Sequence, residues 1–211
     1  MDNDAQDHDA HAAAMKRSSE LAATVIAATR PEQHDAPTPC TDFSVADVIN
    51  HLAFGFEMAR RSGVRENWDP NWQPDSIAPA LDGVPAAEWA AVCGREAPRT
   101  AQAWADPSAW EGESTMGSSA MPAAMVGSMM TAEFVVHGWD LATATGQPYD
   151  PPDEAVQAAI AGVEPMLEMG RDGGWYGAEV TVEGSAPALH RLLAMTGRHP
   201  AWTPAQSQPS R

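Results

Sequence analysis

Positively charged residues are scarce in this chain of 211 residues. Lys and Arg number 12 against 29 Asp and Glu, which gives a formal net charge of −17 at pH 7. So acidic a protein repels the phosphates of nucleic acids and the anionic surface of a membrane. We therefore expect no nucleic-acid partner and no membrane binding, and we expect the partner to be a small-molecule substrate.

Cysteines and long apolar runs are scarce as well. Cys40 and Cys93 form no close-spaced pair, and both are expected to pack in the interior rather than to act as nucleophiles. No apolar run approaches the roughly 20 residues that cross a bilayer. The start Met1–Asp4 lacks the basic and apolar regions of a secretory signal. These absences predict a soluble cytoplasmic protein. The sequence is compatible with both a monomer and a homodimer.

Apolar periodicity and punctuation by Pro and Gly predict a mainly helical fold. The alternating segment Ala178–Glu183 predicts one half-buried strand or edge ribbon. We expect a metal-binding helical body over residues 1–150, a helix-strand-helix appendage packed on it over 151–202, and a mobile tail over 203–211. Helices are expected over Ala10–Thr29, from Ser44 to Gly63, from Pro85 with a kink or break at Pro98, over Ser119–Thr145, after Pro152, and from Ser185 to Gly197.

The second of these helices has the most complete start signal. Ser44 suits the N-cap, and Asp47 three residues later completes a capping box. The inward face of this helix contains His51 and Phe56. His51 is therefore predicted to point into the helical body.

Two chemically active residues lie on the core-facing side of the fourth predicted helix. Glu133 and His137 are four residues apart and share one helix face. An ionised Glu in an apolar interior loses much of its hydration energy unless a cation compensates it. Because residues 126–141 contain no Lys or Arg, a divalent ion held jointly by His51, Glu133 and His137 would supply that compensation.

Two imidazoles and one carboxylate define the chemistry of such a site. On zinc, three protein ligands leave one position open for water or substrate. Zinc is our first expectation, although the same set suits iron(II), and ligand type alone leaves nickel and manganese open. Asp47, one turn before His51, and Asp140, one turn after His137, could orient the two imidazoles as hydrogen-bond acceptors. The alternative is an ordinary helix face with hydrogen-bonded or solvated side chains.

A Met-rich stretch leads into the proposed ligands. Met125 and Met129 lie one turn apart and precede Glu133. Thioethers are soft ligands for copper, but a Met-lined apolar pocket above the metal is the interpretation that we favour. Together with Phe56, such a pocket would accept a bulky, largely apolar substrate.

Two further features of the sequence have open interpretations. Trp68 and Trp72 lie in a Pro-rich connection and either cover the helical body or form part of a lid over the pocket. Arg198 either contacts an anionic ligand or compensates the dipole at the end of a helix.

Four stretches resemble a known family, in the family's order. They are Pro37–Val45 leading into His51, Glu133–Ala142, Thr145–Pro148 and Leu192–Pro200. The chain is similar in these stretches to the DinB-like superfamily, specifically to the actinobacterial proteins related to mycothiol-dependent maleylpyruvate isomerase and the metal-binding proteins grouped with its N-terminal domain.

The resemblance implies a DinB-like four-helix bundle, here with a small C-terminal α+β appendage, and metal ligands at His51, Glu133 and His137. Many members have a His at the position of Glu133, whereas the isomerase branch is similar to this chain in having Glu. Members with assigned activities often transfer or rearrange adducts of mycothiol or related thiols. The resemblance thus implies a thiol-dependent S-transferase or isomerase, with mycothiol as a candidate co-substrate. A non-catalytic binding or sequestration protein and a thiol-independent metal hydrolase are the alternatives.

Overall fold

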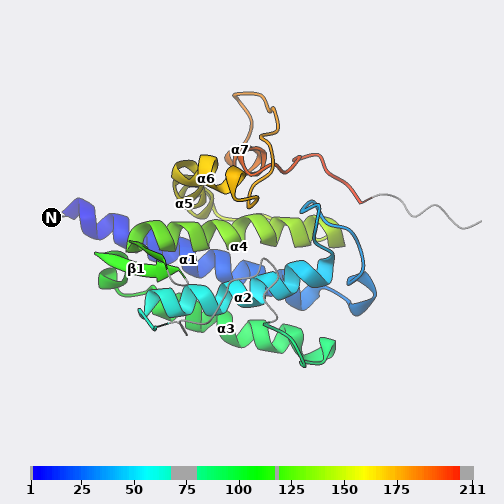
Figure 1. The fold of residues 1–211 in the computed structure, drawn as a ribbon, viewed down its shortest axis with the longest axis horizontal. Helices are drawn as coiled ribbons and strands as arrows, with labels where there is room; N and C mark the ends of the chain where they lie inside the picture. Colours follow the sequence, from blue (N-terminus) through cyan, green and yellow to red (C-terminus); the bar gives the residue numbers. More distant parts are fainter. Residues whose placement is uncertain (1, 68–79, 117–118, 205–211) are drawn as a thin grey trace, which may run out of the picture.

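Four long helices form the body of the protein in a computed structural model that describes residues 2–67, 80–116 and 119–204. They are α1 (Asp2–Ala28), α2 (Val45–Gly63), α3 (Trp89–Ala103) and α4 (Ala123–Thr145). Helices α1 and α2 each pack against both α3 and α4 (Figure 1). This arrangement encloses a shared core between the four helices and confirms the expected mainly helical bundle.

Smaller elements complete the fold. The strands β1 (Glu113–Met116) and β2 (Ser119–Pro122) form an antiparallel pair in which Met116 lies opposite Ser119. Helix α5 packs along α4, and α7 packs against α5, so the later helices cover one side of the bundle (Figure 1). The remaining elements are α5 (Asp153–Val163), α6 (Leu167–Asp172), α7 (Ala188–Met195) and the short 3-10 helices Pro31–Gln33, Ala86–Glu88, Pro107–Trp110 and Glu164–Met166.

Helix α4 is buried on nearly all sides because it lies between the bundle and the later helices. Phe134 belongs to the core that α4 shares with α1, α2 and α3. The next residue, Val135, belongs to a second core shared with α5 and α7. Glu133 and His137 therefore lie on a helix that contributes to two hydrophobic cores.

Both helices that carry the proposed ligands have well-defined ends. The predicted capping box of α2 is confirmed, since Asp47 N donates to Ser44 Oγ at 3.2 Å and Ser44 N donates to Asp47 Oδ2 at 2.9 Å. Helix α4 ends at Gly146, whose φ of 72° lies in the left-handed region that Gly adopts without strain. These ends fix where the ligands stand along each helix.

The predicted strand over Ala178–Glu183 is wrong. The segment forms no strand and borders α7, where Val180 N donates to the Ala194 carbonyl at 3.0 Å. The small sheet is instead formed by β1 and β2, so the predicted start of a helix at Ser119 is also wrong. Pairing with β1 keeps Ser119–Pro122 extended, and α4 begins only after Pro122.

The predicted break at Pro98 does not occur, because α3 continues through it to Ala103. Two side-chain hydrogen bonds tie the chain just after Pro98 to α2. Thr100 Oγ1 donates to the Phe56 carbonyl at 3.0 Å, and Trp104 Nε1 donates to the Ala59 carbonyl at 2.7 Å. These contacts offset the one helical hydrogen bond that a proline removes.

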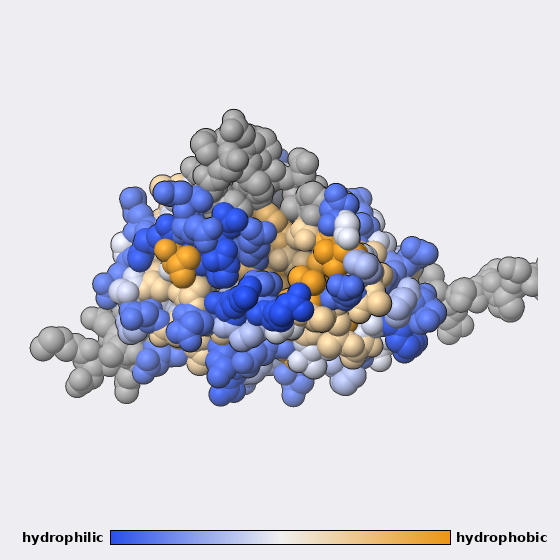
Figure 2. All heavy atoms as spheres, turned by 90° about the horizontal axis from the view of Figure 1, so that it is seen from below, coloured by the Kyte–Doolittle hydropathy of each residue, from blue (hydrophilic) through white to orange (hydrophobic). Residues whose placement is uncertain are grey.

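The face of the protein seen in Figure 2 is largely hydrophilic. Polar and charged residues are spread over the face of the bundle seen in Figure 2, with smaller hydrophobic patches between them. Within the described ranges, no helix combines the length and the apolar character that a bilayer crossing requires. The proposed division of the chain at residue 150 stays a prediction, as does the mobility of residues 203–211, most of which lie outside the described residues.

Candidate metal centre

His51 from α2 meets Glu133 and His137 from α4. His51 Nε2 lies 3.0 Å from Glu133 Oε2, and His137 Nε2 lies 3.4 Å from the same oxygen. One ligand atom from each residue lies within 4.8 Å of the other two. Donors bound tetrahedrally at about 2.1 Å from one ion stand roughly 3.4 Å apart. The three side chains therefore have the spacing that a single divalent ion requires.

Packing between α2 and α4 brings these ligands together. The ring of Phe56 stacks on that of Phe134 with centroids 4.8 Å apart, and both rings are fully buried. Phe134 directly follows Glu133, and Phe56 lies little more than one turn after His51. Phe56 is thus part of the core next to the ligands, where it sets the separation of the two helices.

Phe43 forms an aromatic wall against both imidazoles. Its ring centroid lies 5.4 Å from that of His51 and 6.3 Å from that of His137, while the two imidazoles are 4.6 Å apart. Phe43 lies in the stretch Pro37–Val45 that leads into α2. The structure adds a contact that restricts both rings and limits the access of water to them.

The charge state of the centre follows from these contacts. Burial raises the pKa of Glu133, but the hydrogen bonds and charges of His137 and His51 outweigh burial and hold that pKa well below its ordinary value. Burial lowers the pKa of His137, but Asp140 and Glu133 outweigh it and raise that pKa to about 9. At pH 7 the metal-free protein therefore has an ionised carboxylate beside a protonated imidazole, and a bound cation would displace this proton.

A buried ion pair lies behind His137. Asp140 Oδ2 is 3.0 Å from His137 Nδ1 and 3.1 Å from Arg198 Nη2, and Asp140 has no exposed surface. The approach to Nδ1 is close but lacks the alignment of a hydrogen bond, so charge holds the contact. A proton on Nδ1 facing Asp140 leaves Nε2 available to a metal. Asp140 therefore lies beside Nδ1 of His137, and its role in orienting this imidazole stays a prediction.

Arg198 lies just after the end of α7, and both of its predicted roles, contact with an anionic ligand and compensation of the helix dipole, stay predictions. It is only 6% exposed, its Nη2 faces Asp140, and its Nη1 donates to the Thr196 carbonyl at 3.0 Å. A buried guanidinium needs a counter-charge, and Asp140 supplies it. Arg198 thus links the end of α7 to the carboxylate behind His137.

The other predicted site residues are more distant or engaged elsewhere. Asp47 Oδ2 accepts from Ser44 N and Ser44 Oγ in the capping box, and its role toward His51 stays a prediction. Met125 and Met129 lie on α4 before Glu133, and neither lines the cavity beside Glu133 and His137. Their place in a substrate pocket stays a prediction, and Trp68 and Trp72, the predicted lid, lie outside the described residues.

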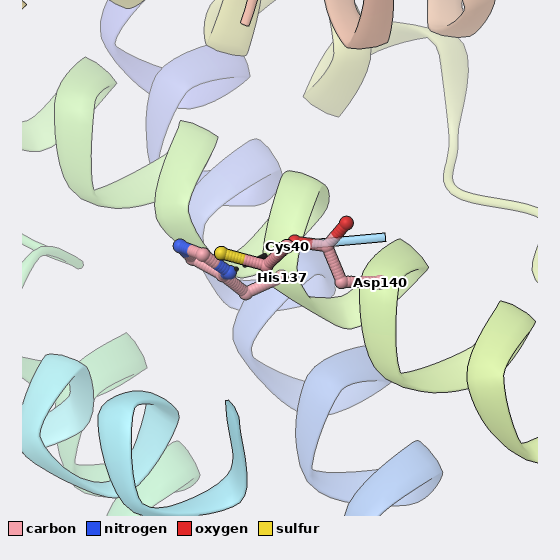
Figure 3. Close-up of side chains that lie close together, drawn as sticks. All are labelled: Cys40, His137 and Asp140. Atoms are coloured by element: carbon pink, nitrogen blue, oxygen red, sulfur yellow. Dashed lines mark ion pairs between the residues drawn. The ribbon is translucent and has the colours of Figure 1, made fainter. Parts of the chain in front are cut away.

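Cys40 lies beside His137, a position that the sequence did not predict. Its sulfur, a ring nitrogen of His137 and a carboxylate oxygen of Asp140 lie within 4.8 Å of one another (Figure 3). Burial raises the pKa of the Cys40 thiol to about 11, so the thiol is protonated at pH 7. Because Arg198 also places a positive charge next to Asp140, this second group suits a cation less well than His51, Glu133 and His137.

A small cavity opens beside the centre. Its volume is about 20 Å³, which is room for roughly one water molecule. A larger hollow of about 610 Å³ lies between α5, α7 and residues 179–184, but none of the proposed ligands lines it. The small cavity matters for chemistry because Glu133 and His137 line it, together with Ala132, Val136, Val163, Trp175, Tyr176, Thr196 and Arg198.

Comparisons with known proteins identify relatives of this chain and its family. Two uncharacterised proteins of Mycobacterium tuberculosis, one from strain CDC 1551 / Oshkosh and one from strain H37Rv, are each 29% identical to this chain over 191 residues. The aligned region covers 88% of this chain and 96% of each relative. No solved structure matches the chain significantly. Residues 14–142, which include all three proposed ligands, match the family described as the mycothiol maleylpyruvate isomerase N-terminal domain. Since this match spans more than half of the sequence, the chain belongs to the mycothiol maleylpyruvate isomerase N-terminal domain family.

Proposed function

We propose that this protein is a metal-dependent enzyme that uses a low-molecular-weight thiol, with mycothiol as the first candidate, to transfer or rearrange an electrophilic, largely apolar small molecule. The observation that supports it best is the convergence of His51, Glu133 and His137, whose ligand atoms lie within 4.8 Å of one another. Membership of a mycothiol-related family supports the thiol. Zinc is the metal we propose, with iron, nickel and manganese as the other candidates.

The protein's own residues would divide the work at this centre. Glu133 and the imidazoles of His51 and His137 would hold the cation, and Asp140 would keep the His137 proton on Nδ1. Phe43 would keep water away from one side of both imidazoles. A divalent cation bound there would supply Lewis acidity and would lower the pKa of a thiol brought to its open position.

Two reactions fit this arrangement. In a transferase reaction, the thiol sulfur forms a bond to the electrophilic carbon, the bond to the leaving group breaks, and the thiol proton leaves with that group or with solvent. In an isomerase reaction, the sulfur adds to a conjugated double bond, the resulting single bond rotates, and elimination restores the thiol and the double bond.

The small size of the cavity favours a second candidate function. About 20 Å³ admits a single water-sized group, as expected of a protein that binds a metal or captures a small molecule without turnover. A hydrolase that uses metal-bound water fits the same cavity. Turnover distinguishes either enzyme from the binding protein, and the need for a thiol distinguishes the thiol-dependent enzyme from the hydrolase.

Turnover measurements test the proposal. The metal-loaded full-length chain would be incubated with a panel of thiols that includes mycothiol and with an activated aryl halide or a cis-configured unsaturated diacid. We expect more than one equivalent of product per protein chain, dependent on both metal and thiol, and its loss in His51→Ala. The matched control is His190→Ala, since His190 is exposed on α7.

The outcomes separate the candidates. Product that stops at one equivalent identifies a capture protein, and hydrolysis without any thiol identifies a hydrolase. Full turnover in a His51→Ala variant that no longer binds metal would contradict a metal-dependent mechanism.

A further inference from the structure

The two tyrosines of this chain have contrasting environments. Tyr149 Oη donates to the Val135 carbonyl at 2.8 Å and reaches the Phe134 carbonyl at 3.3 Å. The hydroxyl of Tyr176, in contrast, has no hydrogen-bond partner in the part of the chain that the structure describes. Tyr176 is half-buried, and its hydroxyl is not one of the buried polar atoms that lack a partner, so water can reach it. The hydroxyl of Tyr176 is therefore available to donate to a molecule from outside the chain.

Tyr176 lines the cavity beside the candidate metal centre. The same cavity is bordered by Glu133, His137 and Arg198. Arg198 is already engaged with Asp140 and with the Thr196 carbonyl. Tyr176 is thus a cavity-lining donor whose hydrogen bond remains to be made.

The backbone holds the Tyr176 ring in place. The amides of Trp175 and Tyr176 both donate to the Gly170 carbonyl, at 2.7 and 3.1 Å. The ring packs directly over Gly170, where any Cβ would collide with it. The backbone turn at Gly170 and the space left by its lack of a side chain fix the ring, so its position does not depend on a bound ligand.

The hydroxyl stays a donor throughout the useful pH range. Burial raises the pKa of Tyr176, and the charge of Glu133 raises it further against the opposing effect of Arg198. A neutral phenol can donate to a negatively charged atom, and hydrogen bonds to charged acceptors are the stronger ones.

We infer that Tyr176 donates a hydrogen bond to the exogenous atom, a thiolate sulfur or an oxygen, that enters the cavity beside Glu133 and His137. The inference rests on the proposed function, because it assigns a residue to the open position of the same centre. Tyr176 lies beyond the family match over residues 14–142. The C-terminal part of the chain thus completes a site whose ligands come from the bundle.

Thiol binding to the cobalt-loaded full-length protein tests this assignment. Cobalt(II) is the spectroscopic probe, 2-mercaptoethanol is the ligand, and the sulfur-to-cobalt absorption reports the dissociation constant. Tyr176→Phe keeps the ring over Gly170 and removes only the hydroxyl. We expect it to weaken thiol binding roughly ten- to a hundred-fold while the affinity for cobalt stays within about twofold of the wild type.

Tyr149→Phe is the matched control, because it also removes one hydroxyl but from a residue with internal partners. It should lower stability and leave thiol affinity unchanged. Equal thiol affinity in Tyr176→Phe and the wild type would overturn the assignment while leaving the proposed function intact. A wild type that binds cobalt but no thiol would overturn the thiol-dependent function, and the Tyr176 assignment with it.

Discussion

Replacing Asp140 by Asn tests the electrostatic support of the centre. The carboxylate is fully buried between Arg198 Nη2 at 3.1 Å and His137 Nδ1 at 3.0 Å. Asn keeps the shape of the side chain but removes its charge. Arg198, only 6% exposed, is then left as a buried cation without a counter-charge.

The expected magnitude follows from that loss. Breaking a buried ion pair by removing one partner costs about 3–5 kcal/mol in the free energy of unfolding. Weakening the support of a metal-bound histidine typically lowers metal affinity by roughly ten- to a hundred-fold. Asp140→Asn should show both effects, because one carboxylate contacts both Arg198 and His137.

Urea unfolding of the metal-free protein measures the first effect, and chelator-buffered zinc titration measures the second. The control is Glu179→Gln, which removes an exposed partner of Arg171 at 3.4 Å and should cost less than about 1 kcal/mol. The double variant Asp140→Leu, Arg198→Met should recover much of the stability but not the zinc affinity. A loss in Asp140→Asn no greater than in the control would refute the reasoning.

Two further predictions concern stability. The raised pKa of His137, about 9 in the folded protein against an ordinary 6.5, stabilises the metal-free chain fully below pH 6.5. This contribution, about 3 kcal/mol, should be lost as the pH rises through 9. Urea unfolding with chelator at several pH values measures it, and a free energy of unfolding that does not change over this range would contradict the prediction. Gly162→Ala should cost about 1–3 kcal/mol, because a Cβ would lie 2.5 Å from the Ser128 carbonyl on α4. Gly94→Ala, with open space around the glycine, should instead stabilise the protein by up to about 1 kcal/mol. Thermal unfolding compares the two variants, and a higher melting temperature for Gly162→Ala than for Gly94→Ala would contradict this.

Local signals in the sequence were the most reliable ones. The capping box of Ser44 and Asp47 depends on residues three apart, and the shared face of Glu133 and His137 depends on one helical turn. Both follow from helix geometry alone. The burial of α4 was also predictable, since the apolar residues around Glu133 leave no polar face for solvent.

Contacts between distant segments could not be predicted in the same way. Asp140 and Arg198 are 58 residues apart, and only the fold brings them together. The same holds for Tyr176, which follows a short helix with no periodic pattern of its own. The alternation at Ala178–Glu183 is typical of a strand, but a strand also needs a neighbour, and sequence alternation does not reveal that this segment lies beside a helix.

Metal content tests the central claim most directly. The full-length protein would be loaded with zinc, freed of unbound metal by gel filtration and measured by elemental analysis, beside Glu133→Gln, His137→Ala and the control His190→Ala. We predict about one zinc per chain in the wild type and the control, and a large loss of zinc in the two ligand variants. Zinc content in Glu133→Gln and His137→Ala equal to that of the wild type would contradict the metal centre, as would a wild type that retains no zinc.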